Sequence, residues 1–246
     1  MRMWMAAVLL ALGVAASAPA SPARAEEGTV DLLLVLAADV SRSVDEKKFK
    51  LQRDGYAAAI ADPRVVRAMT AGPSGRIALC FVEWASNNEQ TIVVDWIAVA
   101  GAGDAEGIAA RVREAPRSYM GRTSISAAID HAMAHLAKSP FQAPRRVIDV
   151  SGDGTNNSGR PVTQARDEAI AAGVTINGLV ILSEVPLPTN PQHTHPPGGL
   201  TAYYENNVIG GPGAFVLEAE SFESFGQLMI SKLIKEIAAG PVRPRG

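Results

Sequence analysis

The sequence of 246 residues contains a single cysteine, Cys80. One cysteine excludes a disulfide framework within the chain and a zinc cluster built from several thiolates. Aromatic residues make up only 5% of the chain, so a broad stacking platform is not expected. Basic residues do not outnumber acidic ones (23 against 25), whereas nucleic-acid-binding proteins usually carry a basic surplus. With 47% hydrophobic residues, the chain is predicted to be a globular protein without a nucleic-acid partner.

A long uncharged apolar run is absent except near the N-terminus. Arg2 is followed by an uncharged apolar stretch from Trp4 to Ala16 and by the small-x-small sequence Ala23-Arg24-Ala25. This order is typical of a secretory signal peptide, and the apolar stretch is shorter than the roughly 20 residues that span a bilayer. An uncleaved anchor is the alternative. We predict cleavage near Ala25, a periplasmic or secreted location, and no membrane span in the mature chain.

Apolar runs and amphipathic stretches alternate along the rest of the chain. Val30–Ala38 is almost continuously apolar, which is typical of a strand buried on both faces of a parallel sheet. We expect strands at 30–38, 76–84, 91–99, 146–150, 174–182 and 214–217, and helices at 44–61, 103–114, 124–137, 161–172 and 221–239. This alternation predicts an α/β fold: a doubly wound, mostly parallel central sheet with helices on both faces.

Residues 183–213 interrupt the alternation with six prolines and several glycines. We expect a long loop here, with one helical turn near Tyr203. Loops of this length in compact domains are often functional. Ser221 is expected to cap the last helix. The predicted organisation is a signal peptide over 1–25, one domain over 26–240 and a disordered tail over 241–246.

Oxygen-bearing side chains follow or precede several of these elements. Asp39, Ser41 and Ser43 come after the first strand, Thr123 lies at the start of a helix, and Asp153 follows the strand at 146–150. Ligands of open α/β sheets bind beyond the carboxyl ends of the strands. Mg²⁺ prefers oxygen ligands in octahedral geometry. The alternative is that the first three residues only cap the following helix.

The order Asp-x-Ser-x-Ser, distant Thr, distant Asp resembles the metal-ion-dependent adhesion site of von Willebrand factor A domains. The resemblance covers most of residues 29–239. The segment Asn177–Leu179, the stretch Tyr203–Gly213 and the terminal helix are similar to a family of secreted bacterial von Willebrand A-like proteins with no assigned function.

The resemblance implies a Mg²⁺ site at the top of the sheet, with Mn²⁺ or Ca²⁺ as other candidate ions. Ser41, Ser43 and Thr123 would bind the ion directly, and Asp39 and Asp153 directly or through water. In such domains an acidic residue of a protein partner completes the coordination.

Other candidate sites are weaker. His131 and His135 share a helix face but lack the glutamate of a zinc protease motif, so we expect a surface or packing role. His193 and His195 are candidate ligands of a transition metal, but with no further ligand identifiable we expect them in a solvated loop. Cys80 is expected to be a buried hydrophobic residue and not a nucleophile. Neither a phosphate-binding loop nor a nucleophile elbow occurs.

Three functions remain as hypotheses. The first is a non-enzymatic, metal-dependent module that binds an acidic residue of a protein partner. The second is a magnesium-dependent hydrolase that uses the same loops, with Asp39 or Asp153 as base or nucleophile. The third is a periplasmic solute-binding protein in which residues 183–213 form a lid.

Overall fold

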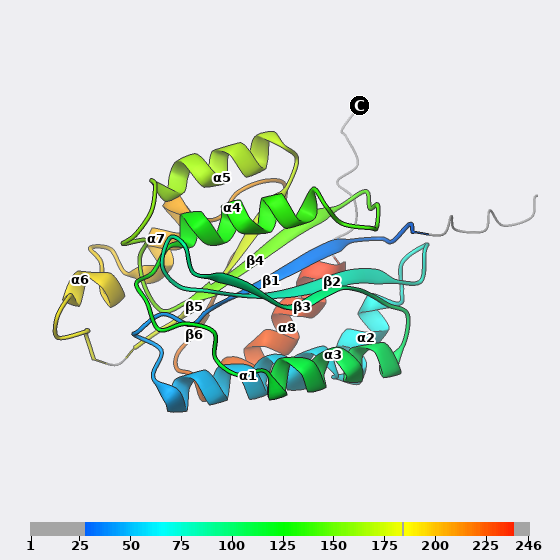
Figure 1. Ribbon diagram of the computed structural model, residues 1–246, viewed down its shortest axis with the longest axis horizontal. Helices are drawn as coiled ribbons and strands as arrows, with labels where there is room; N and C mark the ends of the chain where they lie inside the picture. The colour runs from blue at the N-terminus through cyan, green and yellow to red at the C-terminus, as the bar shows by residue number, and fades with distance from the viewer. Residues whose placement is uncertain (1–27, 184, 239–246) are drawn as a thin grey trace, which may run out of the picture.

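The computed structural model describes residues 28–183 and 185–238, and the predicted signal peptide and C-terminal tail lie outside these residues. Six strands form one sheet in the order β3-β2-β1-β4-β5-β6 (Figure 1). All neighbouring strands are parallel except the pair β2 and β3. The strands are β1 (Leu33–Asp39), β2 (Ile77–Trp84), β3 (Gln90–Val99), β4 (Arg146–Gly152), β5 (Thr175–Ile181) and β6 (Val216–Ala219).

Helices cover both faces of the sheet, which confirms the predicted doubly wound α/β fold (Figure 1). One layer contains α1 (Glu46–Ile60), α2 (Pro63–Met69), α3 (Ala102–Glu114) and α8 (Phe225–Ala238). The other contains α4 (Ile125–Leu136), α5 (Val162–Ala171) and α7 (Leu200–Asn207). The short α6 (Pro191–Thr194) lies beyond the carboxyl edge of the sheet. No helix in the described parts of the chain is both long and apolar enough to cross a membrane.

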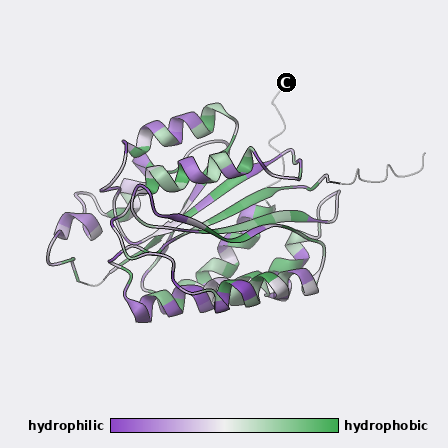
Figure 2. Ribbon diagram, in the orientation of Figure 1, coloured by the Kyte–Doolittle hydropathy of each residue, from purple (hydrophilic) through white to green (hydrophobic). Residues whose placement is uncertain are grey.

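The central strand β1 shows why the sequence folds into three layers. Successive side chains of a strand point to opposite faces. Leu34 and Leu36 pack with α1 and α8 on one side, and Leu33 and Val35 pack with α4 on the other. Every residue of β1 is buried. The strands are accordingly hydrophobic between helices with polar outer faces (Figure 2).

The helix boundaries differ from the predictions at two places. Asp62-Pro63 ends α1 as expected, but the chain restarts at once as α2, because Asp62 caps the new helix and Pro63 occupies its first turn. The predicted cap at Ser221 is wrong. Residues 222–224 form a turn instead, and α8 begins at Phe225.

The topology creates a crevice between β1 and β4. The chain leaves β1 through α1 and α2 in one layer to reach β2, and leaves β4 through α5 in the other layer to reach β5. Because the two connections diverge to opposite faces, the carboxyl ends of these neighbouring strands form a topological switch point, where open α/β sheets bind ligands. Asp39 ends β1 here, and Asp153 follows β4.

The segment 183–213 is more ordered than a long loop. It contains α6 and the two-turn α7, which replaces the single turn expected near Tyr203. Tyr204 and Leu200 of α7 are buried in the core that includes α4 and α5. The segment therefore packs against the body of the domain at the end of the sheet where β1 and β4 terminate.

Candidate metal centre

The five side chains predicted to bind a metal come together at the switch point. Thr123 Oγ1 lies 3.0 Å from Ser41 Oγ, which lies 3.1 Å from Ser43 Oγ. Ser43 Oγ donates to Asp153 Oδ1 at 2.6 Å. Asp39 joins the group through its own loop, since its Oδ1 accepts from the backbone N–H of Ser41 at 2.7 Å. Residues separated by up to 114 positions in the chain thus form one cluster.

The side chain of Asp39 fixes the conformation of the loop after β1 and does not cap the helix that follows. The Asp39 side chain bonds to a backbone N–H two residues on, as in an Asx-turn. Arg117 Nη2 donates to the carbonyl oxygens of Val40 and Ser41, at 2.7 and 2.8 Å, and holds the loop from outside. The N-cap of α1 is Asp45, whose side chain accepts from Lys48 N–H. The alternative that the Asp-x-Ser-x-Ser residues cap the helix is therefore wrong.

The two carboxylates of the cluster are buried and incompletely bonded. Asp39 and Asp153 are fully inaccessible to solvent, and Oδ2 of each has no hydrogen-bond partner. Burial, followed by the charge of Asp153, raises the pKa of Asp39 to about 8. Burial also raises the pKa of Asp153. An unpartnered buried acceptor costs about 1–3 kcal/mol, and more if it is charged, so the cluster is unfavourable as it stands.

The donor set matches a hard divalent cation. Three hydroxyl oxygens and two carboxylates are the ligand types that Mg²⁺, Mn²⁺ and Ca²⁺ accept. The nearest basic group is Lys48, whose Nζ lies 3.7 Å from Asp153 Oδ2 and also bonds to the Ser43 carbonyl oxygen. Within the described residues, the His, Cys, Asp and Glu side chains form no group of three that could hold a metal by themselves. Any metal here would therefore need the hydroxyl groups as ligands.

Two residues of the segment 183–213 adjoin the cluster and were missed from the sequence. His193 is 3% exposed, and its Nε2 lies 3.2 Å from Thr123 Oγ1, so the expectation that it lies in a solvated loop is wrong. His195, by contrast, is exposed. Tyr204 is fully buried, and its hydroxyl has no hydrogen-bond partner. The His-Thr-His sequence at 193–195 and the stretch Tyr203–Gly213 mark these residues, but neither pattern indicates that they lie against the cluster.

Glycines at two positions make room for these side chains. A Cβ at Gly152 would lie 2.6 Å from the Tyr204 hydroxyl and 3.1 Å from Asp39 Oδ2. A Cβ at Gly154 would overlap the imidazole of His193, about 2.1 Å from its Cε1. The glycines on either side of Asp153 are therefore required by close packing on both sides of the cluster.

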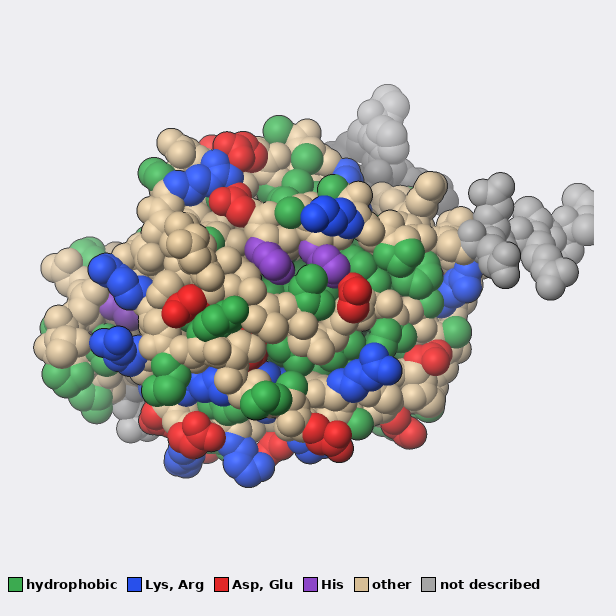
Figure 3. All heavy atoms as spheres, in the orientation of Figure 1, with side chains coloured by type: hydrophobic (Ala, Val, Ile, Leu, Met, Phe, Trp, Pro, Cys, Tyr) green, Lys and Arg blue, Asp and Glu red, His purple; other side chains and the backbone are tan. Residues whose placement is uncertain are grey.

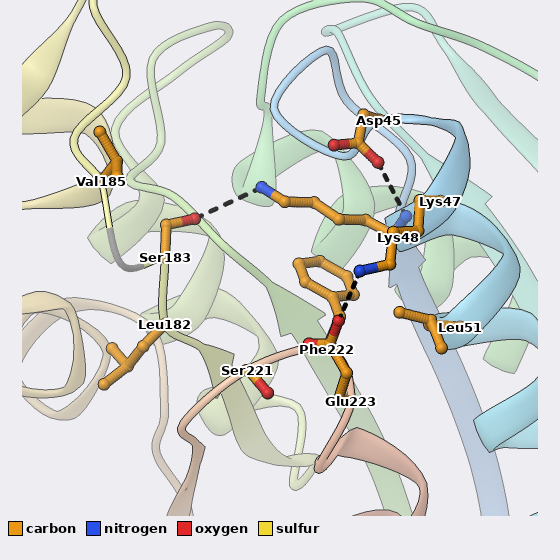
Figure 4. Close-up of a pocket in the computed structure, with 10 residues that line it drawn as sticks. All are labelled: Asp45, Lys47, Lys48, Leu51, Leu182, Ser183, Val185, Ser221, Phe222 and Glu223. Atoms are coloured by element: carbon orange, nitrogen blue, oxygen red, sulfur yellow. Dashed lines mark hydrogen bonds and ion pairs between the residues drawn. The ribbon is translucent and has the colours of Figure 1, made fainter.

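A cleft of about 330 Å³ lies beside the cluster (Figure 4). It is lined by the start of α1, the chain after β5 and the turn before α8. Lys48 extends across it toward Ser183, and Lys47 pairs with Glu223 (Figure 4). Phe222 and Leu51 supply apolar walls. Lys48 therefore lines the cleft and also approaches Asp153 of the carboxylate cluster.

The remaining candidates have structural roles. His135 stacks on Trp96 with ring centroids 5.4 Å apart, and its Nε2 lies 2.9 Å from Asp95 Oδ1. Burial lowers the pKa of His131 on the same helix. Cys80 is fully buried in β2, and burial raises the pKa of its thiol, so it packs as a hydrophobic residue as predicted. On the face shown in Figure 3, acidic and basic side chains are interspersed along the lower helical layer.

Solved structures share this fold at low sequence identity. Proximal thread matrix protein 1 from the mussel byssus matches with a TM-score of 0.62 at 16% identity, over 87% of this chain and 49% of that one. A second structure of it, with a zinc-occupied MIDAS motif, matches with a TM-score of 0.59 at the same identity and coverage. A von Willebrand factor type A structure from Catenulispora acidiphila matches with a TM-score of 0.55 at 14% identity, over 85% and 43% of the two chains.

The pilus adhesin SpaC from Lactobacillus rhamnosus GG matches with a TM-score of 0.60 at 12% identity, over 85% of this chain and 30% of that one. This chain thus spans half or less of the length of these structures. No curated protein matches its sequence. A family model described as "Protein of unknown function (DUF1194)" matches residues 29–241. The chain has the fold of a von Willebrand factor A domain and belongs to the DUF1194 family.

Proposed function

We propose that this protein is a divalent-cation-dependent protein-binding module. The cation is held by Asp39, Ser41, Ser43, Thr123 and Asp153, and an acidic residue of a partner protein completes its coordination. The observation that carries the proposal is the convergence of these five side chains around two buried, unpartnered carboxylate oxygens. A zinc-occupied MIDAS motif in one protein of the same fold supports a cation at this place.

The charge of the site supports a carboxylate as the partner group. Three of the five side chains are neutral hydroxyls, so they leave part of the charge of a divalent ion uncompensated. An ion in a site of this kind favours an anionic ligand at any open coordination position. We propose Mg²⁺ as the resident ion, with Mn²⁺ or Ca²⁺ as alternatives, because all ligating atoms of the set are oxygens.

The cleft beside the cluster gives the partner further contacts. A partner carboxylate at the ion would lie next to Lys48, and the neighbouring partner residue would reach the apolar wall formed by Phe222 and Leu51. Such a contact would give specificity that a single carboxylate does not provide. Because the sequence predicts a signal peptide, we propose that this binding takes place in the periplasm or outside the cell.

Calorimetric titration of residues 26–246 with MgCl₂ tests the cation site. The wild type is expected to bind one ion, and Asp39→Ala is expected to lose binding. Asp45→Ala is the matched control, because Asp45 lies in the same loop but caps α1 instead of facing the cluster. Equal Mg²⁺ affinity of the wild type and Asp39→Ala would refute the site.

Crosslinking and capture from a periplasmic extract tests the partner. A protein that is captured by the wild type in MgCl₂, but not in chelator and not by Asp39→Ala, is the expected result. Replacement of its acidic residues one at a time is then expected to identify one whose loss abolishes capture. Capture that is indifferent to both chelation and Asp39→Ala would contradict metal-dependent binding.

A further inference from the structure

The hydroxyl groups of the metal centre form a chain of hydrogen bonds whose direction is fixed from one end. Ser43 Oγ donates its single hydroxyl proton to Asp153 Oδ1 at 2.6 Å. Ser43 therefore accepts from Ser41, and Ser41 accepts from Thr123. Since Thr123 has used its only proton, the imidazole of His193 must donate to Thr123 Oγ1 from Nε2.

The opposite end of the chain fixes the same direction independently. Asn157 Oδ1 accepts from the backbone N–H of Thr123 at 3.0 Å, so its Nδ2 is the group that faces His193. An amide Nδ2 only donates, and it lies 3.2 Å from His193 Nδ1. Nδ1 is therefore the acceptor, and the proton of the neutral ring is on Nε2. Both ends require the same tautomer.

The backbone around His193 fixes the position of its ring. Thr155 N–H donates to the His193 carbonyl oxygen at 2.9 Å, and Thr155 Oγ1 lies 3.3 Å from Nδ1. The ring also packs against Gly154, where a side chain would collide with it. The imidazole is held by partners on the loop that follows β4, next to Asp153 itself.

This series of hydrogen bonds orients the three hydroxyl groups so that each can bind a cation. A hydroxyl oxygen has two lone pairs and one proton. Each of the three hydroxyls donates its proton along the chain and accepts one bond, which leaves one lone pair for an ion. Without the Nε2–H donor of His193, no hydrogen bond to Thr123 Oγ1 would fix the orientation of this hydroxyl. The hydroxyl would then be ordered only when the ion binds, and the lost conformational entropy would weaken the binding of the ion.

We propose that His193 is a positioning residue of the cation site, which orients the hydroxyls of Thr123, Ser41 and Ser43 through an Nε2–H donor without binding the ion itself. The proposal rests on the cation site described under Proposed function. It also assigns a role to the segment 183–213: this segment forms part of the wall of the site.

Nitrogen NMR of the wild-type imidazole tests the direction of the chain. With ¹⁵N-labelled histidine, the His193 signals are expected to show a protonated Nε2 and an unprotonated Nδ1, both with chelator and with saturating MgCl₂. An Nδ1–H tautomer would overturn the proposal. Coupling between a His193 nitrogen and bound Mn²⁺ in electron spin resonance would also overturn it, because the residue would then be a ligand.

Variants at the same position test the contribution to binding. Loss of a group that orients metal ligands typically weakens metal affinity about 10–100-fold. We expect His193→Ala to weaken Mg²⁺ binding by about tenfold at least, and His193→Gln, whose amide can donate to Thr123, to recover most of the affinity. His195→Ala is the matched control, since this neighbour is exposed. Unchanged affinity in His193→Ala, or no recovery in His193→Gln, would refute the positioning role.

The result is separable from the fate of the cation site itself. If Asp39→Ala abolishes Mg²⁺ binding while His193→Ala leaves it unchanged, the site stands and only the role of His193 fails. If Asp39→Ala binds Mg²⁺ as the wild type does, the cation site fails and the positioning role of His193 fails with it.

Discussion

Two pairs of buried acidic residues, one at the carboxyl edge of the sheet and one between β4 and α8, have different surroundings. Asp39 and Asp153 lie beyond the carboxyl ends of β1 and β4, where no basic group is closer than the 3.7 Å contact of Lys48. Asp149, in the middle of β4, and Glu236, on α8, lie against Lys232, whose Nζ is 2.5 Å from a carboxylate oxygen of each. Asn177 adds a bond to Glu236 at 3.0 Å.

Burial raises the pKa of the carboxyl groups in both pairs, but only Asp149 and Glu236 pack against a buried lysine. Burial lowers the pKa of Lys232, but the charges of Asp149 and Glu236 outweigh it and raise that pKa overall, so the lysine stays charged. The Asp39 and Asp153 pair has no equivalent cation: burial raises the carboxyl pKa of both, and the charge of Asp153 raises that of Asp39 further. The fold thus supplies a cation within its core for one pair. For the other pair, we propose that the cation comes from solvent.

Replacement of Lys232, the buried cation beside Asp149 and Glu236, is expected to have the largest effect on stability. Lys232→Met would leave Asp149 and Glu236 buried without a partner, and breaking a buried ion pair in this way costs about 3–5 kcal/mol. We expect the Tm to fall by roughly 10 °C, given about 2–4 °C per kcal/mol for a domain of this size. Calorimetric melting measures it. A Tm within 2 °C of the wild type would show that the lysine is dispensable.

Replacement of one carboxylate of the Asp39 and Asp153 pair is expected to raise the Tm of the protein without a cation. Asp39→Asn relieves the repulsion with Asp153, so the protein without a cation should gain about 1 kcal/mol, or about 2–4 °C in Tm. The same variant should lose the rise in Tm that Mg²⁺ gives the wild type. Melting curves in chelator and in MgCl₂ measure both effects. A loss of stability in chelator would argue that Asp39 is structural.

The Asp149 and Glu236 pair also predicts that the stability of the protein depends on pH. Burial, and then the charge of Asp149, raises the pKa of Glu236 to about 7, above its ordinary 4.5. A raised carboxyl pKa contributes stability that is present below pH 4.5 and is lost as the pH rises through about 7. From pH 5 to pH 8 the wild type should therefore lose about 2–3 kcal/mol more than Glu236→Gln. Urea unfolding in chelator at both pH values measures it, and parallel pH profiles would refute it.

A matched pair of buried tyrosines gives the smallest effect. The Tyr56 hydroxyl donates to Ser151 Oγ at 2.7 Å, whereas the Tyr204 hydroxyl, near Asp39, has no partner. Without a cation, Tyr56→Phe should cost about 1 kcal/mol, and Tyr204→Phe should be neutral or slightly stabilising. Denaturant midpoints distinguish them. An equal cost in both variants would show that Tyr204 is hydrogen-bonded in solution.

The strands, and their alternation with helices, could be predicted from the sequence because they depend on local pattern, and the five clustered side chains were predicted from the resemblance to von Willebrand A domains. The run Val30–Ala38 is apolar except for Asp31, and the Asp-x-Ser-x-Ser residues follow it directly. The roles of His193 and Tyr204 could not be predicted, since they depend on how a proline-rich segment folds back over glycines 152 and 154. The Lys232 cluster was also missed, because it depends on α8 packing against β4 and β5, which brings Lys232 and Glu236 to Asp149 and Asn177 from distant parts of the chain.

Anomalous diffraction from crystals soaked in Mn²⁺ tests the central claim most directly. The account predicts one strong peak enclosed by the hydroxyls of Ser41, Ser43 and Thr123 and the carboxylates of Asp39 and Asp153, and no such peak in Asp39→Ala crystals. No peak in wild-type crystals at saturating Mn²⁺, or a peak confined to another part of the molecule, would contradict it.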